Sequence, residues 1–286
     1  MNYLVFDVGG TNTKLAFFRD NKLIENKSFK TVKNNSLLRE LISEILYFKK
    51  KYKINKFEGI AVSAPGSLEK EKFMMSAPTN IPGIRNLSLV PLKKFCKKFI
   101  FDNDGDCAAF GAFVLEKKKS KNLACITLGT GVGCGLILNG KLYYGNKVGS
   151  EFGHVTIDIN GKKDNSGNYG TVESYISISG LRNIARKRGL NVSPPELSRL
   201  ASSGNKKARS AYKEYSKYLA TAIVNIANTL DLDTIYLTGG LVHGKRFFLN
   251  QTIKDAKSRF FKGINPRIKA TSENLAFLGG LGLLRR

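Results

Sequence analysis

The segment YLVFDVGGTNTKLAFFRDNKLI, residues 3–24, determines what fold the chain is expected to adopt. β-Branched and aromatic residues flank the stretches GGTN and RDNK, which is typical of three strands joined by two tight turns. The segment LACITLGTGVGCGLILNGKLYY, residues 123–144, repeats this pattern at a constant offset without a gap, so that Gly129 falls on Gly10. The sequence therefore predicts a duplicated architecture.

A helix and a further strand are predicted after each copy. Apolar residues recur at helical spacing over 37–46 and 215–227, and each helix precedes a short apolar segment that runs into glycine. We therefore expect two α/β domains, each with a mixed sheet and helices, facing each other across a central cleft. The predicted N-terminal domain comprises residues 1–105 plus 274–286, and the C-terminal domain comprises residues 106–273.

The chain is strongly basic, with 47 Lys and Arg against 22 Asp and Glu among 286 residues, a net charge of +25. Such a charge suits a polyanion, but the lysine runs lie at the ends of predicted helices, where solvated charge is usual. No aromatic-interleaved basic cluster or helix-turn-helix pattern occurs, so nucleic-acid binding is not expected. The sequence has no long apolar run or signal peptide, which predicts a cytoplasmic protein without a membrane partner.

Three glycine-rich turns follow predicted strands, in DVGGTNTK, LGTGVGCG and LTGGL. Glycine lets backbone N–H groups approach a phosphate closely. The P-loop pattern is absent, and a dinucleotide-binding GxGxxG would open a helix, whereas the first two turns open strands. Two duplicated turns favour a nucleotide held from both sides. They are not equivalent, because the first copy carries Asp7 where the second has Ile126.

The segment IFDNDGDCAAFGAF places three acids at alternate positions after a short apolar strand: Asp102, Asp104 and Asp106. An aspartate at the tip of a strand can accept the proton of a hydroxyl that attacks a phosphoryl group. For Asp106 we prefer an Asx turn or a helix N-cap as the interpretation.

With these segments, SAPGS, APTNIPG, SEFGH and GTVESYIS complete a set whose order and spacing resemble the ROK family of bacterial sugar kinases. That family has the ribonuclease H-like fold of hexokinase, actin and the Hsp70 ATPase, and the resemblance covers essentially the whole chain. It implies phosphorylation of a hexose hydroxyl by ATP with Mg²⁺, in a homodimer. Glucose is the favoured acceptor, so a glucokinase is the first expectation. N-acetylmannosamine, fructose or another hexose remain alternatives.

The resemblance also implies roles for individual residues, with Asp104 as the catalytic base. The residues implied to bind the sugar are Gly66, Asn80, Asn103, Asp104, Glu151, His154 and Glu173. For ATP, Asp7 is expected near the metal and the phosphates, and Gly239 and Gly240 near the adenosine. The two phosphate turns are implied to comprise Gly9, Gly10, Thr11 and Lys14 in the first, and Thr130 and Gly131 in the second.

The chain departs from the family in one loop. Most relatives carry three cysteines after the GH pair, which bind zinc together with the histidine. Aligned on Glu173, this chain has Asp164, Ser166 and Thr171 at those positions. Hydroxyls are weak zinc ligands, so no structural zinc is expected. We hypothesise that Asp164, Ser166 and Asn168 cap backbone amides of the loop and leave His154 free to bond a sugar hydroxyl.

Two further functions, a sugar-responsive regulator and a polyphosphate-dependent kinase, are alternatives. Sugar-responsive ROK regulators carry an N-terminal helix-turn-helix extension, and here the first glycine turn begins within ten residues of Met1, which argues against a regulator. Polyphosphate-dependent glucokinases of the family also lack the zinc cysteines, and a charge of +25 would attract a polyanion. The segment GTVESYIS is typical of ATP-dependent members and favours ATP.

Overall fold

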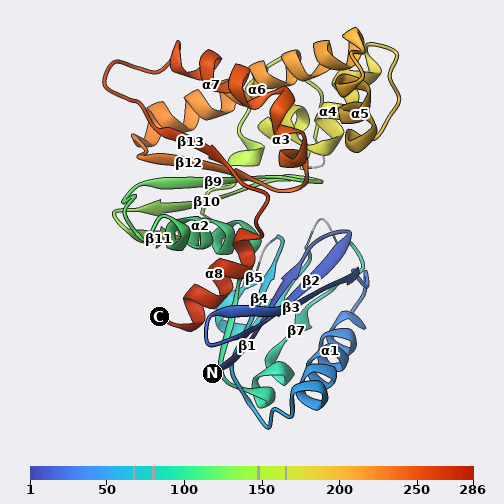
Figure 1. Cartoon of the computed structure of the whole chain (residues 1–286), viewed down its shortest axis with the longest axis vertical. Helices are drawn as coiled ribbons and strands as arrows, with labels where there is room; N and C mark the ends of the chain where they lie inside the picture. Colours follow the sequence, from blue (N-terminus) through green and yellow to red (C-terminus); the bar gives the residue numbers. More distant parts are fainter. Residues whose placement is uncertain (67, 79–80, 147–148, 165) are drawn as a thin grey trace. The chain divides into compact units, whose positions relative to one another are not determined.

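The structure is a computed structural model that describes residues 1–66, 68–78, 81–146, 149–164 and 166–286. The chain forms two compact units (Figure 1). Unit 1 comprises Met1–Lys117 with Leu275–Arg286, and unit 2 comprises Lys118–Asn274. The first boundary lies after Lys117, whereas we expected it after residue 105. Helix α2 (Asp104–Leu115) belongs to unit 1 because it packs against α8 (Leu275–Leu284).

In the described residues, unit 1 contains a five-stranded sheet of order β3-β2-β1-β4-β8 and a three-stranded sheet of order β5-β6-β7. Strands β1, β4 and β8 are parallel, whereas β2 and β3 are antiparallel to their neighbours. The elements are β1 (Asn2–Val8), β2 (Asn12–Arg19), β3 (Lys22–Lys30), α1 (Leu37–Tyr52), β4 (Phe57–Ala64), β5 (Leu68–Glu69), η1 (Lys70–Lys72), β6 (Met74–Met75), β7 (Leu87–Ser88), η2 (Val90–Phe95), β8 (Cys96–Asn103), α2 and α8.

Alternating side chains of β1 divide the core of unit 1 between the two faces of its sheet. Leu4 and Phe6 pack in the cluster that includes Leu41 of α1, whereas Val5 packs with Phe277 of α8. This period of two is the ordinary geometry of a strand that is buried on both faces.

Helices α2 and α8 approach each other closely through glycine. A Cβ atom at Gly111 would lie 1.9 Å from the Leu275 carbonyl oxygen, and one at Gly279 would lie 1.8 Å from that of Cys107. Backbone atoms cannot move aside as side chains can, so only glycine fits at these two positions. This contact attaches the C-terminal helix to unit 1 and holds α2, which begins at Asp104.

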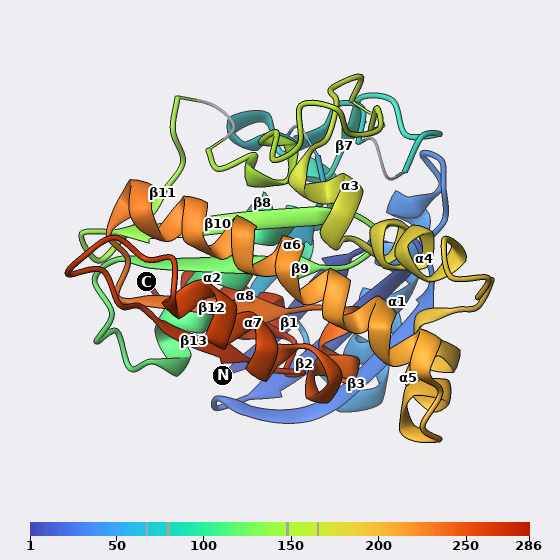
Figure 2. The ribbon, with the colours of Figure 1, turned by 90° about the horizontal axis from the view of Figure 1, so that it is seen from above.

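Unit 2 repeats the sheet of unit 1, with the order β11-β10-β9-β12-β13. The predicted duplication is thus confirmed in both the order and the direction of the strands. Helices α6 and α7 cover one face of this sheet (Figure 2). The elements are β9 (Leu123–Leu128), β10 (Val132–Leu138), β11 (Lys141–Tyr143), η3 (Phe152–His154), α3 (Val172–Ile176), α4 (Ile178–Arg186), α5 (Pro194–Ser202), α6 (Lys206–Leu230), β12 (Thr234–Thr238), η4 (Gly240–Phe247), α7 (Leu249–Lys257) and β13 (Arg267–Ala270).

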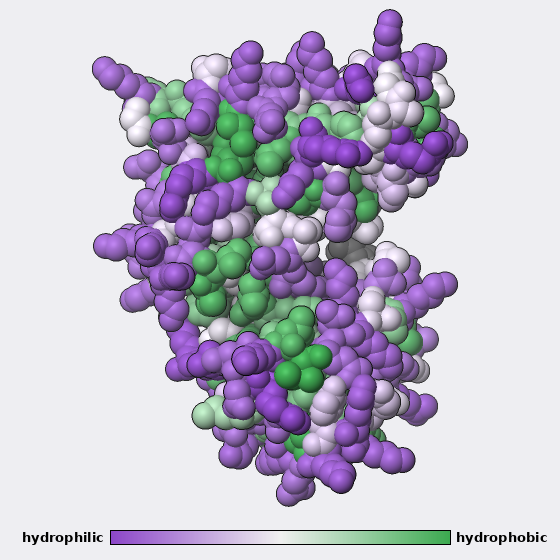
Figure 3. Space-filling model, viewed as in Figure 1, coloured by the Kyte–Doolittle hydropathy of each residue, from purple (hydrophilic) through white to green (hydrophobic). Residues whose placement is uncertain are grey.

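Polar side chains cover much of the face of the molecule that Figure 3 draws. Hydrophobic patches lie between them. Among the helices in the described parts of the chain, none has the length and apolar character that a membrane crossing requires.

A lysine joins the small sheet of unit 1 to the end of β8. The Nζ atom of Lys70 pairs with Asp102 Oδ1 and lies 2.9 Å from Asp106 Oδ2. Both carboxylate side chains are almost fully buried, at 6% and 7% exposure. Burial raises the pKa of Asp106 to about 7; Lys70 opposes this shift and Asp102 adds to it. The ion pair therefore holds two buried carboxylates on either side of Asp104.

We predict that Lys70→Met destabilises the protein by about 2 kcal/mol at pH 8, less than the loss for a fully buried pair because Lys70 keeps 29% side-chain exposure. The loss should be smaller at pH 6. Removing the ammonium raises the pKa of Asp106 further, so the folded variant binds more protons than the folded wild type and loses relative stability as the pH rises.

Urea unfolding at both pH values measures this difference, with Lys72→Met as the control. Lys72 forms an exposed ion pair with Glu69, so its loss should change stability little. Equal effects of the two substitutions, or an effect of Lys70→Met that does not vary with pH, would contradict the role given to Lys70.

Candidate active site

Several of the predicted site residues of unit 1 lie at one edge of its sheet. Asp7 of β1 pairs in register with Ser63 of β4, which pairs with Asp102 of β8. Because these strands are parallel, their carboxyl ends and the loops after them meet at the same edge. The first glycine turn follows β1 there, and Asp104 follows β8.

The first glycine turn is closed by its own backbone and anchored by Thr31. The Gly9 amide donates to the Asn12 carbonyl at 3.1 Å. The Thr31 hydroxyl donates to the Gly9 carbonyl oxygen at 2.6 Å, and the Thr31 amide donates to the Thr11 carbonyl oxygen at 3.0 Å. The turn therefore keeps a fixed course.

Two polar side chains flank the first turn. Lys14 is the cross-strand partner of Asp7 and is exposed. The Ser63 hydroxyl lies 3.4 Å from Asp7 Oδ1 and 3.2 Å from the Phe6 carbonyl oxygen. An acid, a lysine and a hydroxyl thus lie beside the predicted phosphate turn.

Asn103 caps the helix that begins at Asp104. Its side-chain oxygen accepts from the amides of Gly105 at 2.8 Å and Asp106 at 3.4 Å. The preferred interpretation of Asp106 as the N-cap was wrong, because its carboxylate is buried against Lys70. Asp104 is half-buried and its Oδ1 accepts from Gly105 at 2.9 Å. The helix cap thus positions the predicted base at the end of β8.

Of the two residues predicted to lie in sugar-contacting loops of unit 1, the structure describes Gly66. Gly66 is half-buried and has φ +84°, a left-handed conformation that favours glycine. Asn80 lies outside the residues that the structure describes.

The second glycine turn has a different anchor. The Gly129 amide donates to the Gly131 carbonyl at 3.0 Å, and Ile178 at the start of α4 donates to the Gly129 carbonyl at 2.9 Å. The carboxylate of Glu173 accepts from the Val132 amide at 2.9 Å, just after Thr130 and Gly131. Glu173, assigned to the sugar by resemblance, therefore holds the second turn with one of its oxygens.

The third glycine turn follows strand β12, which lies between β9 and β13 in the sheet. Gly239 has φ +98°, and a Cβ atom there would lie 2.6 Å from the Leu128 carbonyl oxygen at the end of β9. Gly240, by contrast, is exposed and has open space where its Cβ would be. This open space suits the close approach of a ligand.

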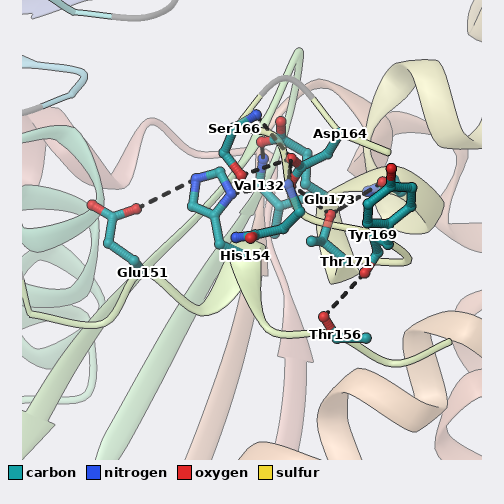
Figure 4. Close-up of polar contacts among 11 residues, drawn as sticks. Val132, Glu151, His154, Thr156, Asp164, Ser166, Tyr169, Thr171 and Glu173 are labelled. Atoms are coloured by element: carbon teal, nitrogen blue, oxygen red, sulfur yellow. Dashed lines mark hydrogen bonds and ion pairs between the residues drawn. The ribbon is translucent and has the colours of Figure 1, made fainter. Parts of the chain in front are cut away.

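His154 belongs to a hydrogen-bonded cluster within unit 2, drawn in Figure 4. Its Nδ1 atom lies 3.2 Å from Asp164 Oδ2, and its Nε2 atom lies 3.8 Å from Glu151 Oε2. Our expectation that His154 is free to bond a sugar hydroxyl therefore needs correction, because one ring nitrogen already has a partner. The Nε2 atom lies on the side of the exposed Glu151.

Asp164 is the centre of that cluster. It accepts from the Ser166 and Asn168 amides at 2.8 and 3.1 Å, so Asp164 caps backbone amides as the hypothesis expected, whereas Ser166 directs its hydroxyl to Asp164. The hydroxyls of Ser166 and Thr171 also donate to it, at 2.6 and 2.9 Å. Across the described ranges, no group of three or more His, Cys, Asp and Glu side chains is placed to hold a metal ion.

A cavity of about 250 Å³ within unit 2 lies beside this cluster. Its walls combine lysines with carboxylates, and Glu173 is the predicted site residue among them. It is lined by Lys162, Lys163, Asp164, Glu173, Ser174, Tyr175, Ser179, Gly180, Asn183, Ile184, Lys187 and Glu214.

Two sets of side-chain contacts, those of Lys70 and those of Asp164, were not predicted from the sequence. Lys70 reaches its carboxylate partners across more than thirty positions of the chain, and no local pattern marks such a contact. Asp164 was assigned only to backbone capping. The one available signal was that Asp164, Ser166 and Thr171 align with positions that bind a common ligand in relatives, which predicts that they lie close together.

The comparisons with known proteins agree with the motifs. The chain is 30% identical over 278 residues to an N-acetylmannosamine kinase of Vibrio cholerae, covering 93% of this chain and 94% of that protein. It is 29% identical over 311 residues to a glucokinase of Halalkalibacterium halodurans, covering 97% and 91%. A xylose repressor of Bacillus spizizenii is 28% identical over 205 residues, 71% of this chain, and the match spans only 53% of the repressor.

The fold is shared with a ROK family glucokinase from Streptomyces griseus, solved in complex with glucose and AMPPNP. The TM-score is 0.84 at 19% sequence identity, and the match covers 100% of this chain and 98% of that one. The sequence profile of the ROK family matches residues 3–282. The chain belongs to the ROK family.

Proposed function

We propose that this protein transfers the γ-phosphoryl group of ATP to a hydroxyl of a hexose, with glucose as the first acceptor to test. The observation that carries the proposal is the common edge of the unit 1 sheet. A glycine turn that suits phosphate and an aspartate that suits a hydroxyl follow two parallel strands of that one sheet. Kinase-named relatives that match almost the full chain support this assignment.

In this proposal, Asp104 accepts the proton of the sugar hydroxyl while the hydroxyl oxygen bonds to the γ-phosphorus and the bond to the β-phosphate oxygen breaks. Its position suits the role, because the helix cap at Asn103 fixes the first residue of α2. With the oxygen of Asn103 accepting backbone amides, its NH₂ group is what it offers to a sugar hydroxyl.

The first glycine turn would bind the phosphates through backbone amides, with Lys14 as a nearby cation. The carboxylate of Asp7 is an oxygen donor of the kind that Mg²⁺ prefers. When bound there with ATP, Mg²⁺ would neutralise charge that develops on the phosphates. Thr130 and Gly131 would contact phosphate from unit 2, and Gly239 and Gly240 would lie near the adenosine.

Glu151 and His154 are proposed to bind sugar hydroxyls, since a carboxylate and an imidazole provide the acceptors and donors that fixed hydroxyls require. Glu173 joins this set in part, because one of its oxygens holds the second glycine turn. A homodimer and the sugar contacts of Gly66 and Asn80 stay predictions from the family resemblance, and a cytoplasmic location stays a prediction from the sequence.

We expect Asp104→Asn to lower kcat by about 10²-fold or more with little change in the KM of ATP, since an amide cannot accept the proton. Glu71→Gln, which changes an exposed carboxylate of the same unit, should leave kcat unchanged. A coupled ADP-release assay measures both variants. Near-normal turnover of Asp104→Asn would assign the base to another group.

The phosphoryl donor separates two kinds of kinase. We expect turnover with MgATP and little or none with inorganic polyphosphate of equal phosphate content, measured as sugar phosphate formed. The opposite preference would mean that the charge of +25 serves to attract a polyanionic donor.

The acceptor is tested by a panel of glucose, N-acetylmannosamine, fructose and other hexoses at a fixed MgATP concentration. We expect the highest kcat/KM with glucose. A higher value for N-acetylmannosamine would move the assignment to the activity named for the Vibrio cholerae relative. If no sugar is phosphorylated and the protein binds a DNA sequence selectively at raised salt, a regulatory function like that of the xylose repressors replaces the kinase.

A further inference from the structure

We propose that the carboxylate of Asp164 takes the place of a metal ion at the centre of the loop between η3 and α3, and that it thereby positions His154. The part of this proposal that concerns sugar binding rests on the proposed function. The part that concerns the loop does not.

Five donors converge on the two oxygens of this one carboxylate. Oδ1 accepts from the amide and hydroxyl of Ser166 and from the Asn168 amide, at 2.6 to 3.1 Å. Oδ2 accepts from the Thr171 hydroxyl at 2.9 Å and from His154 Nδ1 at 3.2 Å. The side chain is 3% exposed. Three of the donors are therefore the side chains that the family alignment places around zinc, and the fourth such position is Asp164 itself.

The arrangement does not fit a bound zinc ion. A metal needs lone pairs that point at a common empty centre, whereas here hydroxyl and ring donors point at a carboxylate. Ser166 and Thr171 use their hydroxyl hydrogens on Asp164, and Asp164 uses both of its oxygens. In this proposal, a carboxylate surrounded by hydrogen-bond donors takes the place of a zinc ion surrounded by lone pairs.

The charge state of Asp164 supports this assignment. Burial alone raises the pKa of this carboxyl, but hydrogen bonds from Ser166, Thr171 and His154 more than offset that, so the pKa lies well below its ordinary value. The group is therefore ionised and can only accept hydrogen bonds. It follows that Nδ1 of His154 carries a hydrogen that it donates to Asp164.

This contact determines what His154 presents to a ligand. With Nδ1 held by Asp164, the ring has a fixed orientation and Nε2 lies on the side of Glu151. Asp164 is thus a positioning residue, because it acts on the proposed sugar contact through His154. In other proteins, too, the hydrogen-bond partner of one histidine nitrogen sets the tautomer and the orientation of the ring, and so determines what the other nitrogen offers to a ligand.

The first test reads the ring directly and needs no enzymatic activity. The chain has only two histidines, and His243 is exposed in η4, so ¹⁵N spectra of the ring nitrogens are simple to assign with His243→Gln. We expect a protonated Nδ1 on His154 in the wild type and the loss of that signal in Asp164→Asn. Asp158→Asn is the control, because Asp158 lies in the same loop but bonds Tyr175. An unchanged His154 spectrum in Asp164→Asn would overturn the positioning role.

The second test asks whether the four positions form a metal site when cysteines are restored. We expect the variant D164C/S166C/T171C to bind about one zinc ion per chain with His154, and to show tetrahedral Co²⁺ absorption, whereas the wild type binds none. Stoichiometric zinc in the wild type would refute the proposal. So would a triple variant that folds, as judged by circular dichroism, but binds neither metal.

The third test separates positioning from a structural effect. Asp164→Asn should raise the sugar KM about ten-fold with a smaller change in kcat, as for the loss of one good hydrogen bond. In the His154→Ala background it should raise KM no further, because the effect passes through the ring. Additive effects would contradict the proposal. If the wild type shows no kinase activity, the proposed function fails, while the spectra and the metal analysis still test Asp164.

Discussion

The parallel alignment of β1, β4 and β8 is the constraint on which the rest of unit 1 depends. Parallel strands bring their carboxyl ends to one edge, and there the register aligns Asp7, Ser63 and Asp102 in adjacent strands. Polar groups at this edge need partners in place of water. Thr31 anchors the glycine turn, and Lys70 satisfies two buried acids. The close contact of α2 with α8 then holds the helix whose first residue is Asp104.

The two copies of the strand–turn–strand segment share their backbone and differ in what anchors the turn. Thr31, which follows the end of β3, holds the first turn, whereas Glu173 of α3 and the start of α4 hold the second. A duplicated backbone thus yields two glycine turns with different surroundings, one beside the acid Asp7 and one stabilised by the acid Glu173 from another element. The difference is set by the elements that follow each hairpin.

Local patterns in the sequence predicted the elements well, and long-range side-chain contacts poorly. Helix α1 followed from apolar residues at helical spacing, and strand β4 followed from a short apolar run that ends in a Pro-Gly turn and is buried along almost its whole length. The pairing of Lys70 with Asp102 and Asp106 did not follow from any local pattern. It depends on where η1, which begins at Lys70, lies relative to the end of β8. The unit boundary shifted for a similar reason, since packing of α2 against the distant α8 decides which unit holds α2.

In the loop of His154, one buried carboxylate collects the hydrogen-bond donors around it. Zinc orders a loop by drawing several electron-pair donors to one positive centre. An ionised carboxylate does the same with the opposite sign, provided that enough hydrogen-bond donors surround it to offset the cost of burying its charge. Asp164 has five such donors, three of them from side chains in the former ligand positions. Hydrogen bonds are individually weaker than metal bonds, so the ordering depends on all of them acting together. The substitution of serine and threonine for cysteine therefore makes sense only with an acid among them, because hydroxyl donors alone would have no common acceptor.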